Sequence, residues 1–181
     1  AALLAFSLTT PALAQAPANP WHAKGRELFS DIIAIPSVTA RTTEVKRTVA
    51  YLKAKFEAGG ITNVIVKDHD GTQSMIVRWS AEPPKKSKKA TAVASKPILL
   101  LGHMDVVEAL PADWSRDPFK LIEEDGYLYG RGTVDMKNGI AAITNALLWL
   151  KAEGFKPKRD IVVFFSGDEE TGGNGAMRAA T

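Results

Sequence analysis

The stretch that decides the fold is Leu99–Asp105, Leu-Leu-Leu-Gly-His-Met-Asp, in which an apolar run ends in an imidazole and a carboxylate two residues apart. An unbroken apolar run of this length is typical of a strand that is buried on both faces of a sheet. In open α/β sheets, ligands gather beyond the carboxyl ends of the strands. The stretch therefore predicts an α/β fold with metal-ligand chemistry at a sheet edge.

Apolar residues elsewhere alternate between helical and strand spacing. Three amphipathic helices are expected: 28–33 before Pro36, 45–56 before Gly59-Gly60, and 140–150 before Gly154. Strands are expected at residues 63–67, 75–79, 98–101 and 161–165, with a hairpin arm at 127–129. We expect a central mixed, largely parallel sheet flanked by helices, in which strands 98–101 and 161–165 are buried on both faces and helix 140–150 forms a crossover.

Acidic residues recur at two further points that suit the same sheet edge. Asp135 lies where a loop enters helix 140–150, and Asp168-Glu169-Glu170 follows strand 161–165 directly. Alone, His103 could be an interior histidine, Asp105 a turn residue and Asp135 a helix N-cap. Three consecutive carboxylates repel one another unless a cation or solvent offsets them, so the combination favours a metal site.

Charge and cysteine content narrow the chemistry. The net charge of +3 comes from residues 81–97, which hold five lysines and one glutamate, and the rest of the chain is slightly acidic. Lys85–Lys89 therefore predicts a solvated surface loop, and no nucleic-acid partner is expected. A surface-binding role for this loop is the alternative. The chain has no cysteine, so any metal must be held by His, Asp and Glu.

The first residues resemble the end of an export signal. An apolar run is followed by Ala12-Leu13-Ala14, which matches an A-x-A cleavage site, so residues 1–14 predict a partial signal peptide and residues 15–20 a linker. A periplasmic or secreted protein is expected, and a frayed helix of a cytosolic protein is the alternative. The apolar run is too short to span a membrane as a helix.

Two other motifs have simpler interpretations. Asp68–Gly71, Asp-His-Asp-Gly, contains an H-x-D pattern, but Asp-Gly between two short strands predicts a hairpin turn. Gly130-Arg131-Gly132 lacks the third glycine of a dinucleotide-binding fingerprint and has no buried strand before it, so no nucleotide site is expected.

Four motifs, in their order along the chain, resemble those of peptidase family M20. This is the two-zinc metallopeptidase family of aminoacylase, glutamate carboxypeptidase and succinyl-diaminopimelate desuccinylase. The motifs are residues 102–107, Trp114 with 117–119, residues 125–137 and residues 168–173. The resemblance implies that His103 binds one zinc, Asp135 bridges two and Glu170 binds the second. It also implies Glu169 as the general base, Asp105 as the group that orients His103, and a cis peptide between Asp135 and Met136.

The resemblance implies a site that cleaves amide bonds. Two zinc ions about 3.5–4 Å apart need an anionic ligand between them, and a nearby carboxylate can take a proton from a zinc-activated water. The resemblance implies hydrolysis of an amide or peptide bond next to a free carboxylate in a small peptide or N-acyl amino acid, with cobalt or manganese as substitute metals. An N-acyl amino acid deacylase or desuccinylase, or a non-catalytic metal-binding module, is the alternative.

The resemblance covers only part of the family pattern. Residues 21–181 would be the N-terminal part of the catalytic domain, because the family's last acidic ligand, its C-terminal histidine and its lid domain, through which homodimers form, have no counterpart in this sequence. We expect the 181-residue chain by itself to bind zinc weakly and to be inactive, since three ligands cannot saturate two metals. Zinc stoichiometry and amidase activity test this, and tight two-zinc binding with turnover would contradict it.

Overall fold

The computed structural model describes residues 19–82 and 96–180. The predicted signal peptide, most of the predicted linker and the Lys85–Lys89 loop lie outside the described residues. Asn19 and Pro20, at the end of that predicted linker, already begin the first helix: the Asn19 side chain accepts a 2.9 Å hydrogen bond from the Trp21 backbone N–H. An Asn cap followed by proline is a favourable helix start.

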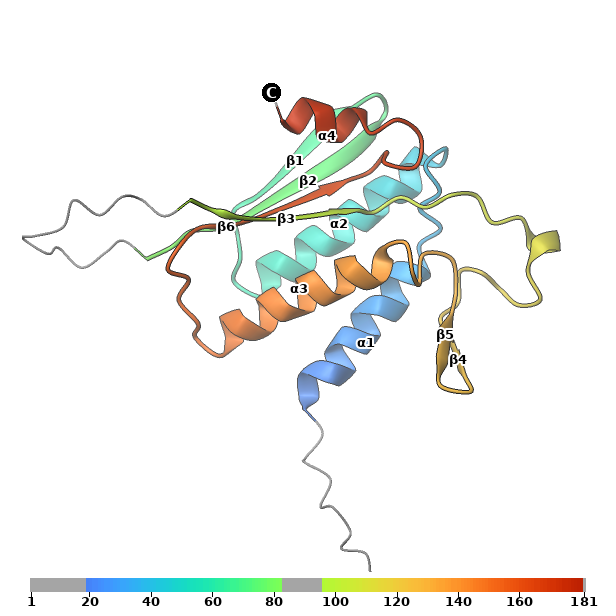
Figure 1. Cartoon of the computed structure of the whole chain (residues 1–181), viewed down its shortest axis with the longest axis horizontal. Coiled ribbons are helices and arrows are strands. Elements are labelled where there is room, and N and C mark those ends of the chain that lie inside the picture. Colours follow the sequence, from blue (N-terminus) through green and yellow to red (C-terminus); the bar gives the residue numbers. More distant parts are fainter. Residues whose placement is uncertain (1–18, 83–95, 181) are drawn as a thin grey trace, which may run out of the picture.

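The chain alternates helices and strands as expected (Figure 1). The elements in order are α1 (Pro20–Ile33), α2 (Thr42–Ala58), β1 (Val64–His69), β2 (Thr72–Trp79), β3 (Ile98–His103), the 3₁₀ turn η1 (Pro111–Asp113), β4 (Ile122–Glu124), β5 (Tyr127–Tyr129), α3 (Lys137–Ala152), β6 (Ile161–Ser166) and α4 (Asn174–Ala179). Among the described helices, none is long and apolar enough to cross a membrane.

The main sheet is mixed, with strand order β1-β2-β6-β3. β1 pairs with β2 and β2 with β6 in antiparallel fashion, while β3 and β6 are parallel, with α3 between them along the chain. The mixed sheet flanked by helices is thus confirmed. The parallel share is smaller than expected, because one of the three pairings of this sheet in the described part is parallel. Asp70 and Gly71, both at positive φ, form the predicted hairpin turn between β1 and β2.

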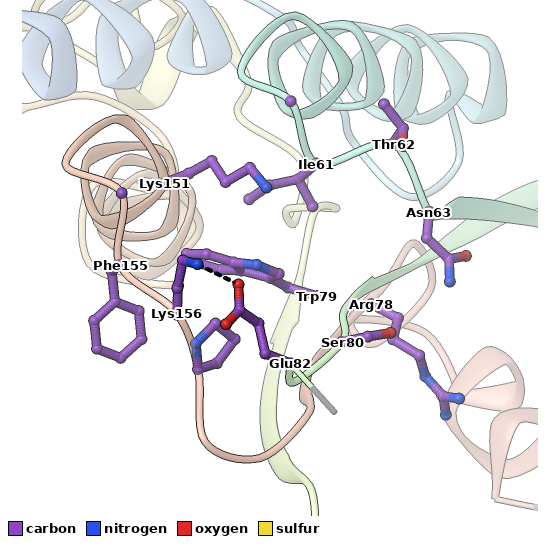
Figure 2. A pocket seen from close by; sticks show the side chains of 13 residues that line it. Ile61, Thr62, Asn63, Arg78, Trp79, Ser80, Glu82, Lys151, Phe155 and Lys156 are labelled. Atoms are coloured by element: carbon purple, nitrogen blue, oxygen red, sulfur yellow. Dashed lines mark ion pairs between the residues drawn. The ribbon is translucent and has the colours of Figure 1, made fainter. Parts of the chain in front are cut away.

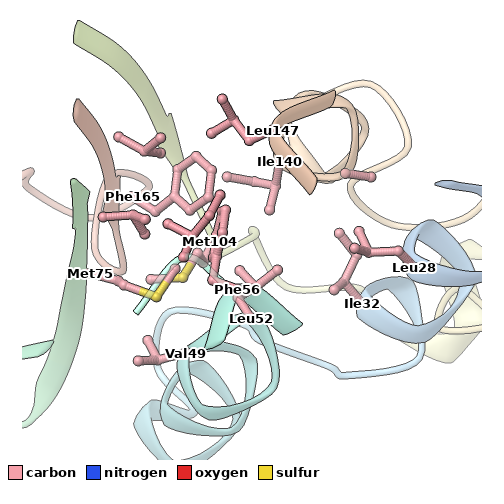
Figure 3. Close-up of a cluster of buried hydrophobic side chains, with 14 of the residues drawn as sticks. Leu28, Ile32, Val49, Leu52, Phe56, Met75, Met104, Ile140, Leu147 and Phe165 are labelled. Carbon is pink, nitrogen blue, oxygen red and sulfur yellow. The ribbon is translucent and has the colours of Figure 1, made fainter. Parts of the chain in front are cut away.

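Helices α1, α2 and α3 lie on one side of the sheet and α4 on the other (Figure 1). The core fills the space between the three helices and the sheet, and Figure 3 shows side chains from α1, α2 and α3 meeting those from β2 and β6. Its fully or almost fully buried members include Ile32, Leu52, Phe56, Met75, Ile140 and Phe165. This single apolar layer fixes β6 and α3, the two elements that flank the predicted site.

Burial on both sheet faces is confirmed for β6 and wrong for β3. Five of the six β6 residues are buried, but Leu99 and Leu101 of β3 are 56% and 59% exposed. β3 is an edge strand of the described sheet, and the face opposite the three large helices is covered only in part, by α4. A hollow of about 270 Å³ remains there, lined by Leu99, Leu101 and small residues of α4.

This asymmetry predicts unequal effects of truncating the two strands. Phe165→Ala empties a fully buried position and should lower the free energy of unfolding of the chain by about 3–5 kcal/mol. Leu101→Ala removes a mostly exposed side chain and should change it by about 0.5 kcal/mol or less. Urea denaturation measures both. Equal losses would show that β3 is as deeply buried as β6.

Candidate metal site

The parallel pairing of β3 with β6 brings two of the predicted clusters to one edge. His103, the last residue of β3, is in register with Ser166, the last residue of β6, and the Met104 backbone N–H donates to the Ser166 carbonyl at 2.8 Å. Asp105 follows the first strand, and Glu169 and Glu170 follow the second. The sequence-predicted groups from these strands therefore emerge side by side.

Asp135 joins them from the loop before α3. Its carboxylate Oδ1 lies 2.9 Å from His103 Nε2. Asp135 does not cap the helix, because Met136 is the N-cap residue and makes no side-chain capping bond. The peptide between Asp135 and Met136 is cis, as the family resemblance implies.

His103 is buried, and each of its ring nitrogens has a defined neighbour. Nδ1 lies 2.9 Å from the backbone carbonyl of Asp105 and 3.4 Å from its carboxylate. The hydrogen bond that orients the ring thus goes to the main-chain carbonyl of Asp105, the residue to which the resemblance assigns this orienting role. With Nδ1–H donating there, Nε2 is the nitrogen available to bind a metal.

The Asp105 carboxylate is fully buried and holds the backbone of the acidic loop, the segment after β6 that begins with Asp168-Glu169-Glu170. It accepts backbone hydrogen bonds from Glu169 at 3.2 Å and Glu170 at 3.1 Å, and a third from the Thr39 hydroxyl at 2.8 Å. Burial alone would raise the pKa of Asp105, but the nearby His103 ring and the hydrogen bonds from Thr39 and the Glu170 N–H lower it. Sequence reasoning missed Thr39, for which the sequence holds no separate signal.

Three of the predicted residues form a group that could hold a metal ion. One ligand atom each from His103, Asp135 and Glu170 lies within 4.8 Å of the others. Glu169 is next to this group, with its Oε2 3.9 Å from His103 Nε2 and its side chain 56% exposed. Imidazole nitrogen and carboxylate oxygen are the ligands that zinc takes where no thiolate is present, so the donor set fits.

The pKa shifts of Glu170 and His103 describe how the charges of this group balance without a metal ion. The pKa of Glu170 is raised by burial and by the neighbouring carboxylates Asp135, Asp105 and Glu169, against the opposing effect of His103. Burial would lower the pKa of His103, but its hydrogen bonds to Asp105 and Asp135 raise it to about 9. In the metal-free protein a protonated His103 thus offsets part of the negative charge.

A buried lysine fixes the loop that carries Asp135. Lys137 is fully buried, its Nζ donates to the carbonyls of Ile32 at 2.8 Å and Ile35 at 2.6 Å, and burial lowers its pKa to about 7. Its stem packs so closely on Gly132 that a Cβ there would lie 3.1 Å from Lys137 side-chain atoms. Lysine is seldom buried, so the sequence did not indicate this role.

A second hollow lies at the other end of the sheet. Figure 2 shows its lining around Trp79, where Lys156 forms an ion pair with Glu82. Its volume is about 450 Å³, and Trp79 pairs with Ile161, the first residue of β6. None of the five predicted site residues lines this hollow. The metal-ligand group and this hollow are therefore separate features.

Comparison with known proteins adds family information. Residues 99–181 match the sequence profile of Peptidase family M20/M25/M40. The N-fatty-acyl-amino acid synthase/hydrolase PM20D1 of Homo sapiens is 42% identical over 158 residues, covering 84% of this chain and 30% of that protein. The probable succinyl-diaminopimelate desuccinylase of Staphylococcus aureus (strain MRSA252) is 34% identical over 156 residues, covering 85% of this chain and 34% of that protein.

A solved structure shares the fold. The di-peptidase Dug1p of Saccharomyces cerevisiae superposes with a TM-score of 0.72 at 21% identity, covering 88% of this chain and 35% of that one. The α/β fold with a mixed sheet is therefore shared with a solved peptidase structure. The chain spans 30% and 34% of the lengths of the two curated relatives named above.

The raised pKa of His103 predicts a pH-dependent stability of the metal-free chain. A histidine whose pKa rises from 6.5 to about 9 on folding stabilises the fold fully below pH 6.5, and this contribution is lost as the pH rises through about 9. The difference in free energy of unfolding between the wild type and His103→Gln should therefore shrink from pH 6.5 to 9. Urea denaturation in chelator measures it. A difference that is constant over this range would contradict the proposed charge state.

Proposed function

Because the chain belongs to peptidase family M20, we propose that the protein is a metal-dependent hydrolase that cleaves an amide or peptide bond next to a free carboxylate. The observation that carries the proposal is the convergence of His103, Asp135 and Glu170, with Glu169 directly beside them. Three ligand side chains and a free carboxylate at one sheet edge are the parts that such hydrolysis needs.

The metal is the first part of the proposal. Family M20 includes dinuclear metal-binding peptidases, and two zinc ions suit the His and carboxylate donors of this chain, with cobalt or manganese as substitutes. His103 would hold one ion, Glu170 the other, and Asp135 would bridge them. When bound, zinc supplies a water of lowered pKa and polarises the amide carbonyl.

Glu169 is the second part. Its carboxylate is more than half exposed at the site, and its backbone N–H is held by the buried carboxylate of Asp105. This arrangement leaves the side chain free to meet a substrate while the main chain stays fixed. Glu169 would accept the proton of the attacking water and pass it to the leaving amine. Asp105 would act through His103 and the acidic loop, without touching the substrate.

The substrate class follows from what the relatives' names share. An N-fatty-acyl-amino acid hydrolase, a desuccinylase and a di-peptidase all act on an amino acid whose amino group carries an acyl or aminoacyl unit. We propose a dipeptide or an N-acyl amino acid as substrate. The signal-like residues 1–14 favour a periplasmic or secreted peptidase over a biosynthetic desuccinylase. Homodimerisation through a lid domain stays a prediction.

Replacing Glu169 tests the proposed chemistry. In the full-length gene product loaded with zinc, Glu169→Gln should lower kcat for dipeptide or N-acyl amino acid hydrolysis by roughly 10²–10⁴-fold, because the amide cannot accept the proton. Zinc content, measured by atomic absorption, should stay at the wild-type value. Glu57→Gln, an exposed residue of α2, is the matched control and should leave kcat unchanged. Full activity of Glu169→Gln would refute the assigned role.

A further inference from the structure

A second buried histidine, His69, lies next to Asp168 at the start of the acidic loop. His69 ends β1, is 7% exposed, and lies on the same face of β1 as the exposed Ile65, which is the face away from the three large helices. Its Nε2 is 2.7 Å from the Ser74 hydroxyl. Its Nδ1 has no hydrogen-bond partner among the described residues, and the nearest carboxylate oxygen, Asp168 Oδ2, is 3.7 Å away.

Asp168 is the residue before Glu169, yet it is not part of the metal-ligand group, and its carboxylate contacts Gly175 and faces His69. It accepts from the Gly175 backbone N–H at 2.9 and 3.3 Å. The Asp168 carbonyl in turn accepts from Gly172 at 3.2 Å and Gly173 at 2.9 Å. Asp168 thus ties the start of the segment 168–175 to the first turn of α4, and Glu169 and Glu170 lie within that segment.

Glycines on both sides of Glu169 and Glu170 pack closely against the β1–β2 hairpin. A Cβ on Gly167 would lie 2.2 Å from the Gln73 carbonyl, and a Cβ on Gly175 would lie 2.7 Å from His69 Nε2. The Thr72 hydroxyl also donates to the Gly167 carbonyl at 3.1 Å. The end of the hairpin and the loop are therefore packed in direct contact, with glycines where any side chain would collide.

The proton positions on His69 follow from its neighbours. An ionised Asp168 can only accept, so the proton of a neutral ring belongs on Nδ1, which faces it. Nε2 then accepts from the Ser74 hydroxyl. The ring would connect β2, through Ser74, with Asp168 at the base of the acidic loop.

From this geometry we propose that His69 is a positioning residue that holds Glu169 and Glu170 in place through Asp168. The inference rests on the proposed function, because it assigns His69 a purpose at that same site. Asp105 fixes the backbone of the two glutamates from one side, and His69 with Asp168 fixes the base of their loop from the other. Groups that orient metal ligands in this way typically contribute 10–100-fold to metal affinity.

Two substitutions test the roles of the two ring nitrogens of His69 separately. The amide nitrogen of asparagine takes the place of Nδ1, so His69→Asn keeps a donor toward Asp168. Glutamine reaches the position of Nε2, so His69→Gln keeps the contact with Ser74 and loses the one with Asp168. In the full-length gene product, zinc affinity measured by calorimetry should fall on the order of tenfold in His69→Gln and be largely kept in His69→Asn.

A readout without metal accompanies this comparison. In the metal-free protein, amide hydrogen exchange of residues 168–175 should be faster in His69→Gln than in His69→Asn or wild type. Equal zinc affinity and equal exchange in the two variants would overturn the proposal, whether both match the wild type or both fall below it. If the wild type binds no zinc, the proposed function fails, and the exchange rates still decide the role of His69.

A third variant covers the case in which His69→Gln does not fold. Asp168→Asn removes the charge that faces Nδ1, while its carbonyl oxygen can still accept from Gly175. It should accelerate exchange in residues 168–175 and weaken zinc binding as His69→Gln does. Wild-type exchange and zinc affinity in Asp168→Asn would overturn the proposal.

Discussion

The carboxylate of Asp105 is the interaction on which the site depends. It is fully buried at the end of β3 and accepts the backbone N–H groups of Glu169 and Glu170 from the loop after β6. A buried carboxylate is costly unless hydrogen bonds satisfy it, so its three donors are required by the fold as much as by the site. Because β3 and β6 are parallel neighbours in register, one residue can serve both strand ends.

The same edge concentrates negative charge that the protein offsets only in part. Asp135, Glu169 and Glu170 converge on His103, and contacts with Asp105 and Asp135 raise the pKa of His103, so that a positive charge is favoured at that point. A divalent cation there would replace the imidazolium proton and take over its role. Metal binding at His103 would therefore be coupled to the release of its proton.

The sequence predicted the elements better than their surroundings. Helical spacing and the Gly59-Gly60 and Gly154 stops placed three helices, and the apolar run before Asp168 placed the central strand β6. The similar run before His103 led to a wrong burial for β3, since an apolar pattern does not say which strand has neighbours on both sides. The order of strands in a sheet depends on contacts between distant residues.

At the site, the candidate metal ligands, Glu169 and Asp105 were predicted, whereas Thr39, Lys137 and His69 were not. His103 and Glu170 were indicated by their positions after strands and Asp135 by its position before α3, and the structure brings the three together. Lys137 and His69 were not recognised, because a lysine is by default exposed and an Asp-Gly turn accounts for the residues around His69. Lys137 donates to backbone carbonyls and His69 faces a carboxylate, and these groups come from distant segments, which no local pattern encodes.

These contacts hold the candidate metal ligands from separate parts of the fold. Lys137 ties the Asp135 loop to the end of α1, Asp105 ties the acidic loop to β3, and the β1–β2 hairpin packs against the base of that loop. The loop that carries Asp135 and the loop that carries Glu169 and Glu170 are therefore held by different parts of the fold, which share the common core between the sheet and the three helices. Carboxylates on separately anchored loops are restrained from moving apart to relieve their repulsion. The fold thereby keeps the charge density that favours a cation at this edge of the sheet.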